Sequence, residues 1–252
     1  MRPQSFRPKM YRDGAVISVG LYCSGPNLSR ALDNRHPRAM RMQRMDGVMG
    51  FYQDRVVPWL INLAMRRHDL VPYRTRIVSA AEGRVLEIGI GSGLNLPFYS
   101  AGVSQVIGLD PSPVLLAMAR DAARGTAAPL KLLEGSAESI PIEDRGVDTI
   151  VTTWTLCSVP EVERALADMR RVLRPGGRLL FVEHGRAPEP RVRWWQDRLT
   201  PAWKRVSGGC HLNRAVAELI AAAGFRFERL DNSRIPGPKP MTYMYEGSAR
   251  PH

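Results

Sequence analysis

Short apolar runs alternate with amphipathic stretches through most of this chain, beginning near residue 50. The runs at residues 84–88, 105–110, 130–133, 147–152 and 178–183 have the length of buried strands. Stretches with apolar residues three and four positions apart lie between them, as in helices that cover a sheet. The alternation predicts a doubly wound α/β domain with helices on both faces of a mostly parallel sheet.

The first helical stretch covers residues 50–80 and carries an apolar stripe that includes Val57, Leu60 and Ile61. Pro72 divides this stretch, because proline lacks the N–H that a helix interior needs. We therefore expect two consecutive helices, with the apolar stripe of the first one buried.

Later helices are marked by their caps and by their spacing. Ser112 stands before a proline as the expected cap of one helix, and Asn213 is expected to cap another. Helical spacing also predicts a helix at residues 161–173, and a short helix is expected near residues 94–100. Strands at 225–230 and 242–247 then complete a sheet of seven strands whose last strand is antiparallel.

The net charge of +12 is unevenly distributed, since +7 of it falls within residues 1–44. Prolines and glycines interrupt residues 1–48, which we expect to be a disordered basic extension. Translation that starts at Met42, Met45 or Met49 would leave the upstream stretch outside the natural protein, and we favour this over a basic tail for an acidic surface. The remainder divides into N-terminal helices at 49–83 and a domain at 84–252.

Composition narrows the classes of function. No apolar run approaches the length of a membrane span, and the chain does not start like a signal peptide. Cys23, Cys157 and Cys210 are too few and too scattered for a disulfide framework or a metal site, which favours a reducing cytoplasm and no metal. Much of the basic charge lies in the extension, and no separate nucleic-acid-binding module is seen, so no nucleic-acid partner is expected.

The most informative stretch, residues 85–93, reads Val-Leu-Glu-Ile-Gly-Ile-Gly-Ser-Gly, and the next apolar run ends in Asp110. A glycine turn after a strand lets the backbone approach a nucleotide-like ligand. A dinucleotide site would need a small residue where Leu94 or Leu96 stands. Glu87 at the strand tip is also unsuited to a pyrophosphate but suits a ligand with a cationic amino-acid end.

With these motifs the sequence resembles the class I S-adenosylmethionine (SAM)-dependent methyltransferases over roughly residues 50–247. The resemblance implies a Rossmann-like fold, with SAM as the methyl donor and S-adenosylhomocysteine (SAH) as the product. The stretch Arg-Val-Leu-Arg-Pro-Gly-Gly at residues 171–177 resembles the family's entry to strand five. In that family the glycine turn carries the methionine part, the acid of strand two holds the ribose, and the turn after strand three borders adenine. The cofactor residues so expected are Glu87, Ile88, Gly89, Gly91, Gly93, Asp110, Pro111, Ser136, Ala137, Glu138 and Thr153.

The motifs Leu-Cys-Ser-Val, Glu-His and Gly-Cys-x-Leu-x-Arg, with Trp-Gln and Pro-x-Trp, follow one another between residues 156 and 214. In this order they resemble the methyltransferase-like 7 group, the thiol S-methyltransferases, which implies hydrogen sulfide or a small apolar thiol as acceptor. The same motif set also resembles phosphatidylethanolamine N-methyltransferases and quinone methyltransferases. Animal members of the thiol group carry an N-terminal membrane anchor; we expect no counterpart of it here, a departure that leaves membrane association open.

A thiol acceptor reacts as its thiolate, so a nearby base is expected. His184 follows strand five, where doubly wound folds place ligands, and His211 lies in a later loop; either can take the thiol proton. The alternative for each is a structural histidine. Cys157 and Cys210 are candidates for substrate contact, although free cysteines are more often small buried apolar residues.

Residues 191–206 form a basic amphipathic stretch with Trp194, Trp195 and Trp203. This stretch is expected to be a substrate lid or a peripheral membrane contact, or else to cover the sheet edge. Together with Cys157 and Cys210, the tryptophans make up the expected acceptor site. A non-catalytic SAM-binding protein and an NAD-binding dehydrogenase are the alternatives from other classes.

Overall fold

The computed structural model describes residues 56–126 and 128–252, which belong to one compact unit. The expected basic extension at 1–48, and residues 49–55 of the expected N-terminal helices, lie outside the described residues. Among the described helices, none combines the length and the apolar character that crossing a membrane requires.

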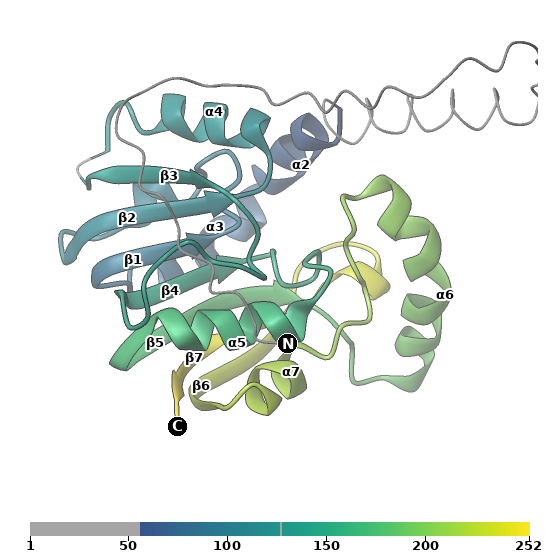
Figure 1. The fold of residues 1–252 in the computed structure, drawn as a ribbon. Helices are drawn as coiled ribbons and strands as arrows, with labels where there is room; N and C mark the ends of the chain where they lie inside the picture. The colour runs from purple at the N-terminus through teal and green to yellow at the C-terminus, as the bar shows by residue number, and fades with distance from the viewer. Residues whose placement is uncertain (1–55, 127) are drawn as a thin grey trace, which may run out of the picture. The chain divides into compact units, whose positions relative to one another are not determined.

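One sheet holds seven strands in the order β3-β2-β1-β4-β5-β7-β6 (Figure 1). The first five strands pair in parallel. β7 lies between β5 and β6 and is antiparallel to both. The predicted sheet is thus confirmed. Its strands are β1 (Gly83–Ile88), β2 (Val103–Asp110), β3 (Leu130–Glu134), β4 (Val147–Thr153), β5 (Leu173–His184), β6 (Phe225–Arg234) and β7 (Tyr243–Pro251).

The helices of the described residues follow the predicted alternation, with short 3₁₀ helices between them. The α-helices are α2 (Val57–Met65), α3 (Val71–Val78), α4 (Pro113–Ala122), α5 (Val162–Val172), α6 (Pro190–Val206) and α7 (Val216–Ala222). The 3₁₀ helices are η2 (His68–Leu70), η3 (Leu96–Phe98) and η4 (Lys239–Met241).

Two hydrophobic clusters lie on opposite faces of the sheet, because successive strand residues point to opposite sides. In β5, Phe181 belongs to the cluster covered by α5 and α7, and Val182 belongs to the cluster covered by α3. Figure 1 shows α5 and α7 on the near face of the sheet and α3 behind it. The amphipathic spacing of α5 places Leu166 and Met169 fully in the core, as predicted.

The stripe expected on α2 is wrong in one respect, since Leu60 is 48% exposed while the polar Asn62 is buried. The reason is a polar partner: the Ser92 hydroxyl donates to Asn62 Oδ1 at 2.7 Å. α2 therefore turns its polar position toward the glycine turn and leaves part of its apolar stripe outside.

Two helix ends also differ from expectation. The helix expected near residues 94–100 is only the 3₁₀ turn η3, since Asn95 turns inward to a buried carboxylate. Asn213 does not cap α7, which begins at Val216 without a side-chain cap. Its amide donates instead to Asp197 Oδ1 of α6 at 2.7 Å, so a tertiary partner takes the group that a cap would use.

Candidate active site

The glycine turn after β1 has the backbone that its sequence predicts. Gly89, Gly91 and Gly93 have φ angles of +69°, +56° and +78°, a left-handed region that other residues rarely adopt. A Cβ on Gly89 would stand 2.3 Å from Thr155 Oγ1, whereas around Gly91 the nearest atom would be 3.9 Å away. The turn therefore presents bare backbone at the carboxyl ends of β1 and β4, after the buried Ile88.

Glu87 is buried beneath this turn, with both carboxylate oxygens engaged. Asn95 Nδ2 donates to Oε1 at 2.7 Å, and the Tyr99 hydroxyl donates to Oε2 at 2.7 Å. Burial raises the pKa of Glu87 to about 7, against these hydrogen bonds. Asn95 Nδ2 also donates to Thr153 Oγ1 at 2.9 Å, which joins the tips of β1 and β4.

Arg74 of α3 completes this network, although it carries no sequence signal beyond its place in a helix. Its guanidinium donates to Asn95 Oδ1 and to the Met65 carbonyl, and it stacks 4.8 Å from the centre of the Trp154 ring. Burial lowers its pKa to about 10, which the negative charge of Glu87 opposes. Sequence reasoning missed Arg74, Asn95 and Tyr99; the polar Asn95 between two leucines was the one usable signal.

Asp110 ends β2 with its carboxylate held from two sides. Oδ2 accepts from the Gly91 N–H at 3.0 Å, and Oδ1 accepts from the Ser112 N–H at 2.9 Å. Burial raises the pKa of this carboxyl, and the two backbone donors oppose the shift. The contact with Gly91 brings the two parts of the expected cofactor site together, and the neighbouring Pro111 is exposed.

The turn after β3 lies beside this acid, because Asp110 pairs with Glu134 in the sheet. Ala137 is buried in the core cluster, and the Ser136 hydroxyl bonds the Glu138 carboxylate. Glu138 also accepts from the Glu161 N–H at 3.3 Å. The expected adenine residues therefore line the strand tip next to Asp110.

A second group of residues gathers at the carboxyl ends of β4 and β5. The side-chain donor atoms of Cys157, His184 and Cys210 all lie within 4.8 Å of one another. His184 Nε2 stands 2.9 Å from Cys210 Sγ, and Trp203 Nε1 donates to the same sulfur at 3.4 Å. We call Cys157, His184 and Cys210 the Cys-His-Cys cluster.

The charges in this cluster are coupled. The neighbouring Cys157 and burial raise the pKa of the Cys210 thiol well above its usual range. Burial lowers the pKa of His184, but its contact with Cys210 and the charge of Glu183 together outweigh burial and raise this pKa. His184 Nδ1 is buried and has no hydrogen-bond partner among the described residues.

Glu183, adjacent to His184, fixes the segment that carries Cys157. Its Oε1 accepts from the N–H groups of Thr155 and Leu156, at 3.0 and 3.1 Å, and from the Thr152 hydroxyl at 2.9 Å. Its other oxygen is buried without a partner in the described part of the chain, and burial raises the pKa of this carboxyl. Sequence reasoning quoted Glu183 as part of the Glu-His motif and assigned it no role in the site.

His211 contacts the backbone of the cluster residue Cys157. Its backbone N–H donates to the Cys157 carbonyl at 2.8 Å, and its Nδ1 lies 3.1 Å from that oxygen. Arg214 donates to the carbonyls of Leu156 and Val159, so the same short segment is held at three positions. Burial and the charge of Arg214 lower the pKa of His211.

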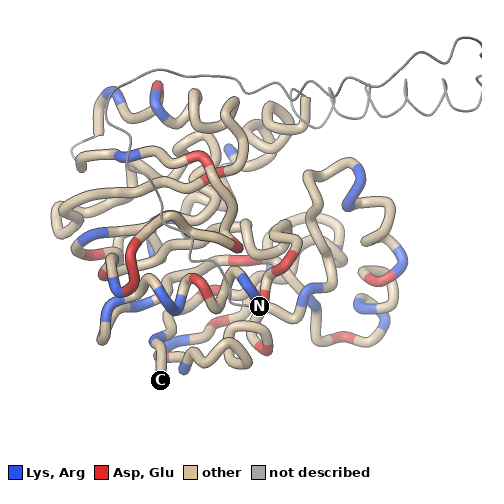
Figure 2. Tube along the Cα trace, in the orientation of Figure 1, with Lys and Arg blue, Asp and Glu red and all other residues tan. Residues whose placement is uncertain are grey.

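The three tryptophans of α6 differ in their surroundings. Trp203 reaches Cys210, whereas Trp194 and Trp195 are 47% and 52% exposed and stack edge to face at 4.8 Å. Arg198 lies 4.3 Å above the Trp194 ring. Figure 2 shows Lys and Arg residues spaced along α6. Arg191, Arg198 and Lys204 are exposed, so the exposed face of this helix is both aromatic and basic.

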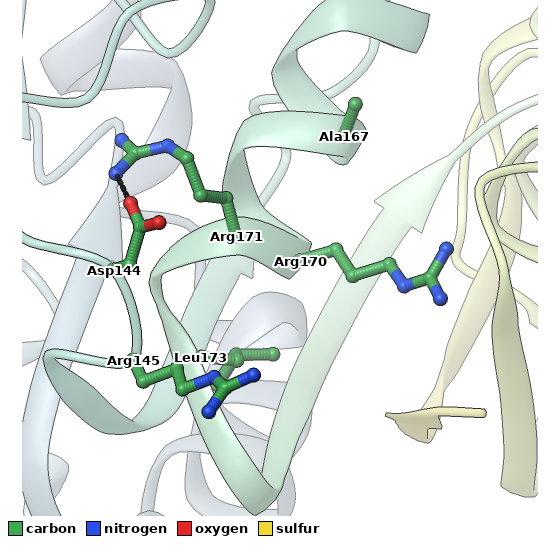
Figure 3. A pocket seen from close by; sticks show the side chains of 6 residues that line it. All are labelled: Asp144, Arg145, Ala167, Arg170, Arg171 and Leu173. Carbon is green, nitrogen blue, oxygen red and sulfur yellow. Dashed lines mark hydrogen bonds and ion pairs between the residues drawn. The ribbon is translucent and has the colours of Figure 1, made fainter.

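A shallow hollow lies away from the active site, between the end of α5 and the loop before β4, and its lining has a structural role. Figure 3 shows its lining, in which Arg171 pairs with Asp144 at 2.7 Å. Arg171 also donates to the carbonyls of Ile140 and Ile142 and bonds Asp168, so it ties α5 to the loop before β4. The first arginine of the Arg-Val-Leu-Arg motif thus has a structural role, through its hydrogen bonds and ion pairs.

Comparison with curated proteins gives close relatives. Human thiol S-methyltransferase TMT1B is 34% identical over 171 residues, which are 64% of this chain and 67% of that protein. Human thiol S-methyltransferase TMT1A is 33% identical over 158 residues, or 60% of this chain and 64% of the relative. Phosphatidylethanolamine N-methyltransferase of Cereibacter sphaeroides is 40% identical over 109 residues, 42% of this chain and 53% of that protein. The matches thus span between about half and two thirds of these relatives.

Solved structures and a family model agree with this result. A SAM-dependent methyltransferase of Thermotoga maritima, described as a possible histamine N-methyltransferase, aligns with a TM-score of 0.58 and 20% identity, covering 81% of this chain and 99% of that one. This likeness shows the fold. Residues 86–181, which hold the glycine turn, Asp110 and β4, match the model of the methyltransferase domain. With its sheet, its glycine turn and these relatives, the chain belongs to the SAM-dependent methyltransferases.

Proposed function

We propose that this methyltransferase methylates the sulfur of hydrogen sulfide or of a small apolar thiol. The observation that carries the proposal is the Cys-His-Cys cluster, because three of the five motifs that resemble the thiol group each supply one of its members. The names of the relatives TMT1B and TMT1A support the same acceptor class.

The residues around the glycine turn fit SAM. A Cβ on Gly91 would contact only the Gly89 carbonyl, at 3.9 Å, which leaves room for a ligand against the backbone. Asp110 offers carboxylate oxygens to ribose hydroxyls, and the buried Glu87 suits a cationic amino group. We assign the cofactor contacts to these residues, with Ile88, Gly89, Gly93, Pro111, Ser136, Ala137, Glu138 and Thr153 around them. Membership of the methyltransferases also sets aside the NAD-binding alternative.

SAM supplies an electrophilic methyl group, and the protein's task is to align an acceptor with it and to exclude water. A thiol has a reference pKa of about 8.5 and must lose its proton to react well. His184 is the titratable nitrogen that faces sulfur in the cluster, at 2.9 Å from Cys210. We assign to His184 the stabilisation of the acceptor's deprotonated sulfur, and to His211 the positioning of Cys157.

Trp203 and the two cysteines give the acceptor site an apolar, polarisable wall. This wall suits a small thiol better than a charged metabolite. Trp194 and Trp195 lie on the exposed face of α6 and fit a lid or a peripheral contact with a membrane. That face favours the second candidate, a lipid or quinone acceptor, which the names of other relatives also suggest. A cytoplasmic location accords with both candidates.

An acceptor panel tests the proposal. Purified protein is given radiolabelled SAM with hydrogen sulfide, methanethiol, phosphatidylethanolamine or a demethylquinone, and Asp110→Ala serves as the control with weakened cofactor binding. We expect label in the volatile products, methanethiol from hydrogen sulfide and dimethyl sulfide from methanethiol. Exclusive labelling of the lipid or of the quinone would overturn the thiol proposal and establish the second candidate.

A further inference from the structure

The Cys-His-Cys cluster joins two soft sulfur donors and one imidazole nitrogen donor that are far apart in sequence. Cys157 follows β4, His184 ends β5, and Cys210 lies in the loop after α6. The sulfurs are buried, with Cys157 2% and Cys210 9% exposed, and both thiols are free. Scattered spacing predicted no metal site here, but the fold has assembled a ligand set that spacing could not reveal.

The donor set is one that zinc prefers. Two cysteine sulfurs and one imidazole nitrogen form the protein part of known catalytic zinc sites, which keep a fourth position open. Zn–S bonds of about 2.3 Å and Zn–N bonds of about 2.0–2.1 Å place tetrahedral donor atoms about 3.5–3.8 Å apart. The present separations, from 2.9 Å to at most 4.8 Å, bracket this range, so small side-chain rotations complete the geometry.

We propose that Cys157, His184 and Cys210 bind one Zn²⁺ ion whose fourth position takes the sulfur of the acceptor. This inference rests on the proposed thiol acceptor. Within the described residues the cluster supplies three protein ligands. A structural zinc site has a fourth protein ligand, so here the fourth coordination position is open to a substrate. The cluster also lies at the carboxyl ends of the strands, where an acceptor must meet the cofactor.

The chemistry balances without a further reactant. The acceptor's S–H bond breaks, its proton leaves to solvent, and its sulfur binds the ion as a thiolate. The sulfur then attacks the methyl group, the bond from that methyl to the sulfonium breaks, and SAH leaves as a neutral thioether. A thiol acceptor gives a neutral thioether, a weaker ligand than a thiolate, which dissociates. Hydrogen sulfide, bound as HS⁻, gives methanethiol, which leaves as a neutral thiol. His184 acts through the ion as a ligand.

Metal binding is measured on the full chain, independently of activity. The protein is loaded with Zn²⁺ for elemental analysis and with Co²⁺ for absorption spectroscopy. We expect one ion per chain, thiolate-to-cobalt charge-transfer bands, and a change in the cobalt d–d bands when methanethiol is added. Cys157→Ser and Cys210→Ser should each lose the bands, whereas Cys23→Ser, the third cysteine, should keep them. SAH binding in each variant shows that the protein is folded.

The outcomes separate this inference from the acceptor proposal. Negligible zinc in the loaded wild-type protein, or unchanged metal content in the Cys157→Ser/Cys210→Ser double variant with SAH binding intact, would overturn the metal site. A zinc-free protein that methylates thiols at the full rate would leave the acceptor proposal standing and reject the metal site. One tightly bound ion in a protein that methylates only lipid would keep the metal site, reject the thiol acceptor, and reject the role given to the fourth position.

Discussion

At the scale of single residues, the two strand-tip carboxylates differ in how they are held. Asp110 is fixed by two backbone N–H groups, whereas Glu87 is fixed by side chains and lies fully enclosed. Both carboxylates lie at the carboxyl edge of the sheet, at the ends of neighbouring strands. They are therefore the residues at which a single substitution tests the cofactor site most directly.

Asp110→Ala should weaken binding of SAH by about one to two orders of magnitude. The ribose hydroxyls lose a charged acceptor, an interaction worth about 1–3 kcal/mol. Isothermal titration calorimetry measures the change. Asp121→Ala is the matched control, since it removes an exposed aspartate of α4 paired only with Arg124, and it should bind like the wild type. Equal affinities for the two variants would remove Asp110 from the ribose site.

The stability of the cofactor-free protein should fall between about pH 4.5 and pH 7. The folded protein raises the pKa of Glu87 from 4.5 to about 7, so the neutral carboxyl stabilises the fold below this window and the stabilisation is lost as pH rises through it. The expected loss is roughly 3 kcal/mol from this group. Urea unfolding at pH 5 and pH 8 measures it.

Glu87→Gln should flatten this pH dependence, because glutamine stays neutral at both pH values. Glu218→Gln, a substitution at an exposed position of α7, should keep the wild-type slope. If Glu87→Gln and the wild type show the same difference between pH 5 and pH 8, the carboxyl of Glu87 does not titrate in that window.

At the scale of elements, the glycine turn and α6 are held by contacts that their own sequences do not contain. The turn approaches Thr155 of a different strand end, and α6 is anchored through Gln196. Such contacts decide where the active-site elements lie relative to the sheet.

Gly89→Ala should destabilise the protein more than Gly176→Ala does. Both glycines have left-handed φ angles, +69° and +78°, which cost an alanine about 1–2 kcal/mol. At Gly89 the new methyl group would clash with the Thr155 side chain, whereas at Gly176 it would have no atom within 4 Å. We expect about 1–3 kcal/mol of additional loss, measured by urea unfolding, with weaker SAH binding. Equal losses would mean that Thr155 moves aside freely.

Gln196→Ala should loosen α6 and cost about 2–4 kcal/mol of stability. The buried amide accepts from the Ala187 N–H and donates to the carbonyls of Gly185 and Pro240, so its removal strands three backbone groups. Arg198→Ala on the exposed side of the same helix is the control and should change little. Thermal unfolding compares the two, and similar midpoints would show that α6 is anchored elsewhere.

At the scale of the whole molecule, the layered fold follows from periodicity. Runs such as residues 147–152 are buried on both faces, so they read as strands of a covered parallel sheet, and α5 reads as a helix with one buried face. Prediction failed where a tertiary partner overrode a local signal. Asn213 donates a hydrogen bond to Asp197 of α6 instead of capping a helix. Asn62 of α2 is buried because it accepts a hydrogen bond from the Ser92 hydroxyl.

The sequence alone determined the sheet, the glycine turn, the acid of β2 and the family, because these features depend on short-range order. The tertiary structure alone decided that Arg74, Asn95 and Tyr99 surround Glu87, and that Trp203 rather than Trp194 or Trp195 faces Cys210. It also assembled Cys157, His184 and Cys210, more than 20 residues apart in sequence, into one cluster. The physical reason is the parallel sheet, which brings the carboxyl ends of distant strands to one edge.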